Sequence, residues 1–151
     1  MNYEWRRDRY RISTDKSLLD VPMIHEFLSR RSYWALGRTI EQVRRTIEHS
    51  IVFGLYDGER QIGFSRVVTD YVSMAWLGDV FILEDARAGG LGKWLIGAVM
   101  SHPELQDIRR WVLTTKDAHG LYKQFGWEPL PEPERFMHKF RQEKSCDRTA
   151  G

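Results

Sequence analysis

A glycine-dense turn between an apolar segment and an amphipathic segment is the part of the sequence best suited to chemistry. It contains Gly89, Gly90 and Gly92, with the cationic side chains of Arg87 and Lys93 on either side. Glycines let a backbone approach a ligand closely and aim successive N–H groups at one point. A helix that begins directly after the turn adds unpaired N–H groups and a favourable dipole. The turn therefore indicates a site for phosphate oxygens, although glycine also occurs in loops that bind nothing.

Two common phosphate-binding patterns do not fit this turn. A P-loop requires Ser or Thr after its lysine, whereas Lys93 is followed by Trp94, which offers no hydroxyl to a magnesium ion. A dinucleotide-binding fingerprint requires a different glycine spacing after the first strand of a parallel βαβ unit. The segments before this turn instead predict a meander of antiparallel strands.

The elements that would position the turn follow from hydrophobic periodicity. Apolar residues recur at helical spacing between Leu18 and Leu28 and again between Ile40 and Ile47, where Thr39 is a candidate cap. Strands are predicted over residues 10–14, 51–56, 61–70, 74–83, 110–115 and 136–140, and further helices over 91–100 and 118–125. This order predicts a mixed α/β fold, in which helices flank a mostly antiparallel central sheet.

Composition limits the class of protein. The chain has 151 residues with 23 basic and 21 acidic side chains, so its net charge of +2 is weak support for nucleic-acid binding. It lacks an apolar run of about 18 residues, a secretory signal, and any Cys or His spacing typical of zinc sites, and Cys146 is its single cysteine. We expect one cytoplasmic domain over residues 1–151, with a core at about 9–140 and a polar tail at about 142–151, and no metal, nucleic-acid or membrane partner.

Two motifs in this order resemble those of the GNAT superfamily of N-acetyltransferases, which use acetyl-coenzyme A. The first is R-x-x-G-x-G, formed by Arg87, Gly90 and Gly92 after a predicted strand and at the start of a predicted helix. The second, AHGLYKQFGW over residues 118–127, is similar to the family's A-x-x-L-Y-x-x-x-G-F segment, with Trp127 at the last aromatic position. The element order also matches, so the resemblance covers roughly residues 9–140.

The resemblance implies acetyl-coenzyme A as the cofactor and assigns its contacts. Strand residues Val80, Phe81 and Ile82 would pair with the pantetheine arm, where a backbone N–H would polarise the thioester carbonyl. The pyrophosphate would be held by Arg87, Ala88, Gly89, Gly90, Leu91 and Gly92, with added charge from Lys93. Two positions depart from the family. Ala88 replaces a common glycine, and Thr115 stands where many relatives have Asn, so one contact to the pantetheine arm is expected to change.

The same resemblance suggests catalytic residues. Tyr122 matches the family's general acid, which protonates the coenzyme thiolate, and a phenol with an ordinary pKa of about 10 is protonated at neutral pH. Asp79 lies just before the pantetheine-binding segment, where relatives often have an acidic residue. Burial among apolar neighbours should raise the pKa of Asp79, which suits a base or a partner in a water relay. An equal alternative is a carboxylate that only hydrogen-bonds a neighbouring strand or loop.

The loop between the first two helices covers the acceptor in this family. In this chain it contains Tyr33 and Trp34, which could form a wall of an amine pocket, partly through cation–π contact, or could pack over the core. Dimers are frequent in the family, so a homodimer is one expectation to test.

Together these observations favour acetyl transfer to a primary amine of a small molecule or protein, by direct attack in a ternary complex. The alternative is a non-catalytic acyl-coenzyme A sensor or partner-binding domain with the same fold. The intact motif residues Arg87, Gly90, Gly92 and Tyr122 argue against that alternative, and turnover with a panel of amines separates the two.

Overall fold

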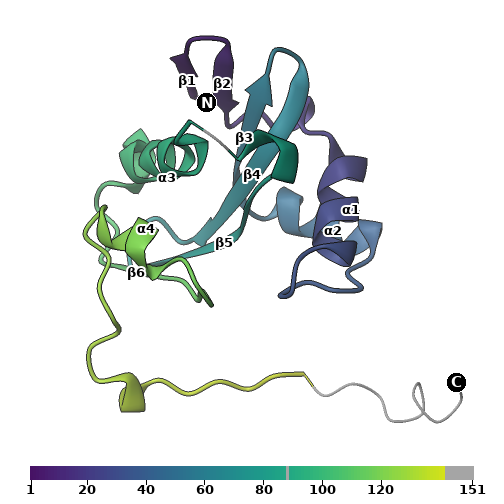
Figure 1. Ribbon diagram of the computed structural model, residues 1–151. Coiled ribbons are helices and arrows are strands. Elements are labelled where there is room, and N and C mark those ends of the chain that lie inside the picture. Colours follow the sequence, from purple (N-terminus) through teal and green to yellow (C-terminus); the bar gives the residue numbers. More distant parts are fainter. Residues whose placement is uncertain (88, 142–151) are drawn as a thin grey trace, which may run out of the picture.

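A six-stranded sheet forms the centre of the computed structural model, which describes residues 1–87 and 89–141 (Figure 1). The strands are β1 (Glu4–Arg7), β2 (Tyr10–Ser13), β3 (Ile51–Asp57), β4 (Arg60–Thr69), β5 (Met74–Ile82) and β6 (Arg110–Val112). They lie in sequence order across the sheet, and every neighbouring pair is antiparallel except β5 and β6, which are parallel. The predicted mixed fold with a mostly antiparallel sheet is therefore confirmed.

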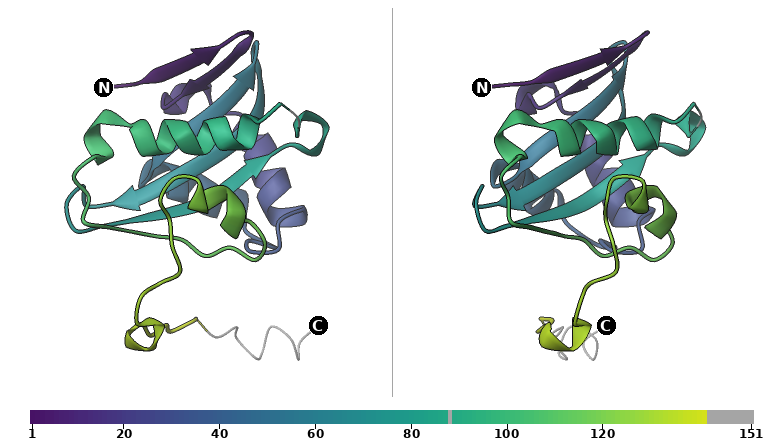
Figure 2. Two further views of the ribbon diagram at one scale, coloured as in Figure 1. Left: turned by 60° about the vertical axis from the view of Figure 1, so that its left-hand side comes forward. Right: turned by 90° about the vertical axis from the view of Figure 1, so that its left-hand side faces the viewer.

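Helices cover both faces of this sheet. They are α1 (Val21–Arg30), α2 (Ile40–Glu48), α3 (Leu91–Ser101) and α4 (His119–Lys123), joined by the short 3-10 turns Lys16–Leu18, Glu84–Ala86, Pro103–Leu105 and Pro133–Arg135. Figures 1 and 2 show α1 and α2 on one face and α3 with α4 on the other. Thr39 caps α2 as predicted, because its hydroxyl accepts from the Gln42 N–H at 3.1 Å while the Gln42 side chain accepts from the Thr39 N–H.

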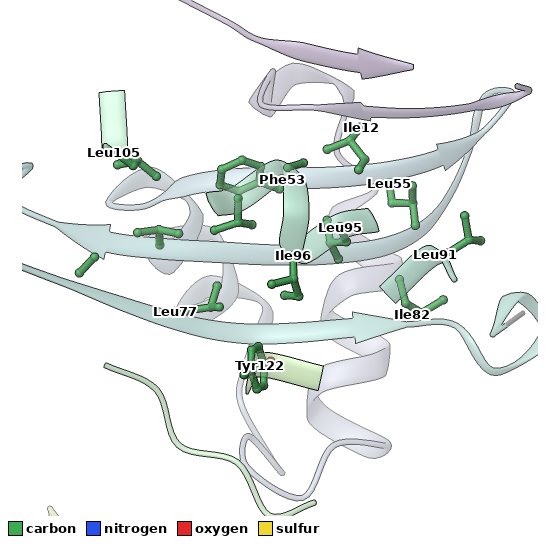
Figure 3. Packing of buried hydrophobic residues seen from close by; sticks show 14 of the residues in the cluster. Ile12, Phe53, Leu55, Leu77, Ile82, Leu91, Leu95, Ile96, Leu105 and Tyr122 are labelled. Carbon is green, nitrogen blue, oxygen red and sulfur yellow. The ribbon is translucent and has the colours of Figure 1, made fainter. Parts of the chain in front are cut away.

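Side chains that alternate along each strand build a separate hydrophobic core on each face. On the α3 side, Phe53, Leu95 and Ile96 belong to a buried cluster that also includes Tyr122 (Figure 3). On the α1 and α2 side, Val52 and Phe81 pack in a second buried cluster. The adjacent residues Val52 and Phe53 thus point to opposite faces, which fixes the register of the sheet against both helical layers.

An irregularity in β5 shapes the end of the sheet where the site lies. Between the pairs Phe64–Phe81 and Arg66–Gly78, a single residue of β4 faces two of β5, Asp79 and Val80. Such a β-bulge bends its strand, and Asp79 takes a left-handed φ of 52° there. Strand β5 pairs with β6 only through residues 74–76. From residue 77 to 82 its β6 side therefore has no strand partner within the described ranges.

Several predicted elements differ from the structure. Residues 136–140 were predicted as a strand, and this prediction is wrong, because the segment joins no ladder and leaves the body after α4 (Figure 2). Prolines 129, 131 and 133 remove backbone donors just before it, and its side chains Met137 and Phe140 are exposed. The strand predicted over 110–115 ends at Val112, where β5 and β6 diverge, and the helix predicted over 118–125 covers only His119–Lys123.

The hairpin of β1 and β2 extends the sheet beyond its predicted edge. Strand β1 was not predicted because Glu4, Arg6 and Arg7 give it no apolar alternation. The predicted polar tail, with Cys146, lies outside the described residues. Within residues 1–87 and 89–141, no helix has both the length and the apolar character needed to span a bilayer.

Candidate functional site

A groove of about 690 Å³ opens where β5 diverges from β6. Its walls come from β5, the glycine turn before α3, helix α4 and the loop between α1 and α2. Among the predicted site residues it contains Tyr33, Trp34, Val80, Phe81, Ile82, Arg87, Gly89, Gly90, Leu91, Gly92 and Tyr122. The structure therefore brings together side chains from three distant segments of the chain in one place.

The glycine turn forms the end of the groove at the start of α3. Gly89 and Gly90 both have left-handed φ values, 72° and 73°, which glycine adopts without steric cost. Gly90 is the N-terminal cap of α3 and supplies no capping side chain, so the first N–H groups of the helix are left for a ligand. A Cβ added at Gly92 would meet open space. The turn is thus a backbone cradle with room for an anion beside it.

Cations lie near this turn, and one of them comes from β1 at the far end of the sheet sequence. The Arg7 guanidinium in β1 donates to the Gly89 carbonyl at 2.7 Å and lies over the Trp94 ring at 5.8 Å. Arg87 folds back, and its Nε donates to the Ile82 carbonyl at 2.9 Å. Lys93 is exposed and does not line the groove, and Ala88 lies outside the described residues.

Tyr122 on α4 places its ring against the core and lines the groove. The residue is 7% exposed, and its ring packs 5.8 Å from that of Trp127. Burial raises the pKa of Tyr122, and nearby Tyr33 raises it further. The phenol therefore stays protonated at neutral pH and can donate a proton into the groove.

Asp79 is buried behind the groove and fully engaged. Its Oδ1 accepts from Trp34 Nε1 at 2.7 Å, and its Oδ2 accepts from Arg38 Nη1 at 2.7 Å and from Arg66 Nε at 2.6 Å. Burial alone would raise the pKa of this carboxyl, but the charges and hydrogen bonds of Arg66 and Arg38 outweigh burial and lower it. The expectation of a raised pKa is therefore wrong. A carboxylate with a lowered pKa is a weak base.

The loop between α1 and α2 is held across the groove by its two aromatic residues. Tyr33 accepts a hydrogen bond from the Lys116 backbone N–H at 3.1 Å, which links the loop to the segment before α4. The Trp34 ring meets the Tyr33 ring edge to face at 5.1 Å and is fixed by its bond to Asp79. Trp34 also lines a second cavity of about 950 Å³, so this residue belongs to the walls of both spaces.

One predicted site residue lies outside the groove, and two arginines near the site were not predicted. The Thr115 hydroxyl accepts from the Ala118 N–H at 3.0 Å and lies in a neighbouring pocket rather than in the groove. Arg38 and Arg66 were not singled out. A charged Arg66 inside the apolar strand 61–68 is a signal for a buried acidic partner, and it could have been recognised.

Comparison with known proteins gives one consistent family. The model of the Acetyltransferase (GNAT) domain matches residues 48–129, more than half of the chain. A Gibberella zeae protein named "Putative acetyltransferase FG08082" is 30% identical, over 85% of this chain and 84% of its own. A crystal structure from Xanthomonas campestris, described as belonging to the GNAT family, is 45% identical with a TM-score of 0.85, over 87% of this chain and 93% of its own.

A more distant structure shares the fold. It is a GNAT family acetyltransferase from Elizabethkingia anophelis with acetyl-CoA bound, 14% identical with a TM-score of 0.58, over 79% of this chain and 76% of its own.

Proposed function

This protein is an N-acetyltransferase of the GNAT family, and we propose that it transfers the acetyl group of acetyl-coenzyme A directly to a primary amine within a ternary complex. The observation that supports this reaction best is the groove itself. It combines an uncapped helix start, an unpaired sheet edge and a protonated phenol. Each of these matches one part of a thioester substrate.

The residues of the groove fit the coenzyme. The N–H groups of Gly90 to Gly92 would bind the pyrophosphate, next to the cations of Arg7 and Arg87. The open side of β5 at Val80, Phe81 and Ile82 would pair with the amides of the pantetheine arm, as an added strand does. When bound, the coenzyme supplies an acetyl group activated as a thioester.

The reaction would need a neutral amine, a proton for the leaving thiolate and a destination for the one proton that the amine loses. The amine nitrogen would form a bond to the acetyl carbon while the carbon–sulfur bond breaks. Tyr122 would donate its proton to the thiolate and regain one from water, and a backbone N–H of β5 would hold the carbonyl oxygen as negative charge develops on it. For the amine proton, we propose release to water in the groove, with Asp79 as a positioning residue for Trp34 and Arg38 because its pKa is lowered.

Two measurements test this function. Calorimetry should detect acetyl-coenzyme A binding to the full chain, and thiol release should then be measured with a panel of primary amines. Absence of coenzyme binding at millimolar concentration would overturn the proposal. Coenzyme binding without turnover of any amine would favour the non-catalytic sensor instead.

A further inference from the structure

We propose that the acceptor amine carries an anionic group, a carboxylate or a phosphate, which binds in the second cavity beside Trp34. We call this space the basic cavity, and its lining includes four arginines, Arg38, Arg45, Arg66 and Arg141, together with His49. The inference rests on the proposed function, because it names the class of acceptor for the same reaction. The anionic end would lie in the basic cavity, and the amine would reach past Trp34 into the groove.

The lining of the basic cavity has one sign of charge. Helix α2 contributes Arg45 together with the polar side chains of Gln42 and Thr46, and its C-terminal cap residue His49 also lines the cavity. Within the described ranges, no Asp or Glu lines this cavity. A concave site with cations and hydroxyl or amide donors, and without carboxylates, attracts anions and repels a free ammonium group.

Two of the cations share one carboxylate, which leaves one positive charge in excess. Arg38 and Arg66 are partly buried and both bind the buried carboxylate of Asp79, so the three side chains together have a net charge of +1. The guanidinium of Arg66 uses Nε for Asp79 and Nη1 for the Ser50 hydroxyl, and Arg38 uses Nη1 for Asp79. Because a guanidinium has five N–H donors, both arginines keep donors for a ligand oxygen.

Arg45 is the side chain most free to bind. It is exposed on α2, and within the described part of the chain no carboxylate lies within salt-bridge distance of its guanidinium. Its neighbour Arg44 is also exposed but does not line the cavity. Arg44 and Arg45 have the same side chain and differ in whether that side chain lines the cavity, so Arg44 is a matched control for Arg45.

Trp34 connects this cavity to the reaction. The residue lines both the groove and the basic cavity, and the hydrogen bond from its Nε1 to Asp79 holds its ring in place. An anion bound by Arg38 and Arg66 would therefore lie next to the same residue that borders the thioester. The cavity would also disfavour polycationic acceptors.

The test uses four small amines in two matched pairs: β-alanine with β-alaninamide, and O-phosphoethanolamine with ethanolamine. Binding of each to the full-length protein is measured by calorimetry, and acetylation by thiol release. At least one anionic member should bind about tenfold more tightly than its neutral partner, which corresponds to about 1.4 kcal/mol. The preferred pair identifies the anion as carboxylate or phosphate.

Two variants on α2 test whether the anionic group binds in the basic cavity. Arg45→Gln should remove most of the preference for the anionic amine over its neutral partner and raise KM for the anionic amine. Arg44→Gln should keep this preference. The affinity for acetyl-coenzyme A should be unchanged in both variants. Equal binding of charged and neutral members, no binding of any member at millimolar concentration, or equal effects of the two variants would overturn the inference. Failure of acetyl-coenzyme A to bind would overturn the proposed function instead, and the amine-binding data would still decide this inference.

Discussion

At the scale of single residues, the hydroxyl of Tyr122 is the group whose role can be tested most directly. Tyr122→Phe removes one oxygen and keeps the buried ring in the core. If the phenol protonates the thiolate, kcat should fall by about 100-fold, while the Kd for acetyl-coenzyme A stays nearly constant. Steady-state kinetics with calorimetry measures both quantities.

A matched control is available on β3. Tyr56 is 1% exposed, and its hydroxyl has no hydrogen-bond partner among the described residues, so Tyr56→Phe should leave kcat unchanged. An unchanged rate in the Tyr122 variant would exclude Tyr122 as the acid.

A substitution at Asp79 can remove the charge of the side chain while its shape is kept. Asp79→Asn keeps the size of the side chain and its tolerance for a left-handed φ, but leaves Arg38 and Arg66 without their carboxylate. We expect a loss of about 2–4 kcal/mol of unfolding free energy, because two partly buried cations lose their partner. Denaturant titration measures this loss.

The pH profile distinguishes the two roles of Asp79. A positioning residue changes the level of kcat but leaves the shape of its acid limb, whereas loss of that limb in Asp79→Asn would identify Asp79 as the base. Sequence alone could not decide between these roles. The partners Trp34 and Arg38 lie 45 and 41 residues away, and they meet Asp79 only because the bulge in β5 places it there.

At the scale of elements, the first turn of α3 can be tested for stability and binding together. Gly92→Ala should raise the unfolding free energy by up to about 1 kcal/mol, because alanine favours helix and its Cβ would meet open space. The same methyl group would occupy room beside the glycine turn, so the Kd for acetyl-coenzyme A should rise at least about tenfold. Thermal unfolding and calorimetry give the two values.

Gly97 on the same helix provides the comparison. A Cβ there would make ordinary contact with the Phe125 ring at 3.6 Å, so Gly97→Ala tests helix preference alone. Equal coenzyme affinities for the two variants would show that Gly92 does not face the coenzyme.

The elements differ in how well the sequence predicts them. The strands of the meander and helix α3 have clear periodicity and are found as predicted. Residues 136–140 also contain apolar side chains, but they join no strand among the described residues, and periodicity cannot show whether a partner strand exists. Strand β1 forms although the sequence pattern does not predict it. Its backbone pairs with β2, but its charged side chains do not show the apolar alternation that is typical of a strand.

At the scale of the whole molecule, one buried residue joins three parts of the fold and predicts a pH dependence. His102 follows α3 and is 2% exposed, and its ring packs 4.7 Å from Tyr3 and 5.7 Å from Phe53. Burial lowers the pKa of His102, and Glu104 only partly opposes this. In the unfolded chain the imidazole titrates near its ordinary pKa of about 6.5.

The sign of the effect follows from proton uptake. Between the lowered folded pKa and about 6.5, the unfolded chain binds a proton that the folded protein does not bind. The unfolding free energy should therefore be full above about pH 6.5 and fall as the pH is lowered toward the folded pKa. Urea titrations across this window measure the fall. His102→Asn keeps an acceptor for the Glu104 N–H and should flatten the dependence of unfolding free energy on pH. The control His138→Asn, in the exposed segment 136–140, should leave that dependence unchanged. Identical slopes in all three proteins would contradict this assignment.

The shared wall formed by Trp34 has a consequence for the order in which substrates bind. Trp34 is the one residue found in the linings of both the groove and the basic cavity, and the other described lining residues of the two spaces differ. If the acceptor enters through the basic cavity, either substrate can bind first. Initial rates measured at several concentrations of both substrates should then give intersecting patterns. A dead-end analogue of either substrate should be competitive against its own counterpart and noncompetitive against the other substrate. Uncompetitive inhibition by the acceptor analogue against acetyl-coenzyme A would show a compulsory order and contradict independent entry.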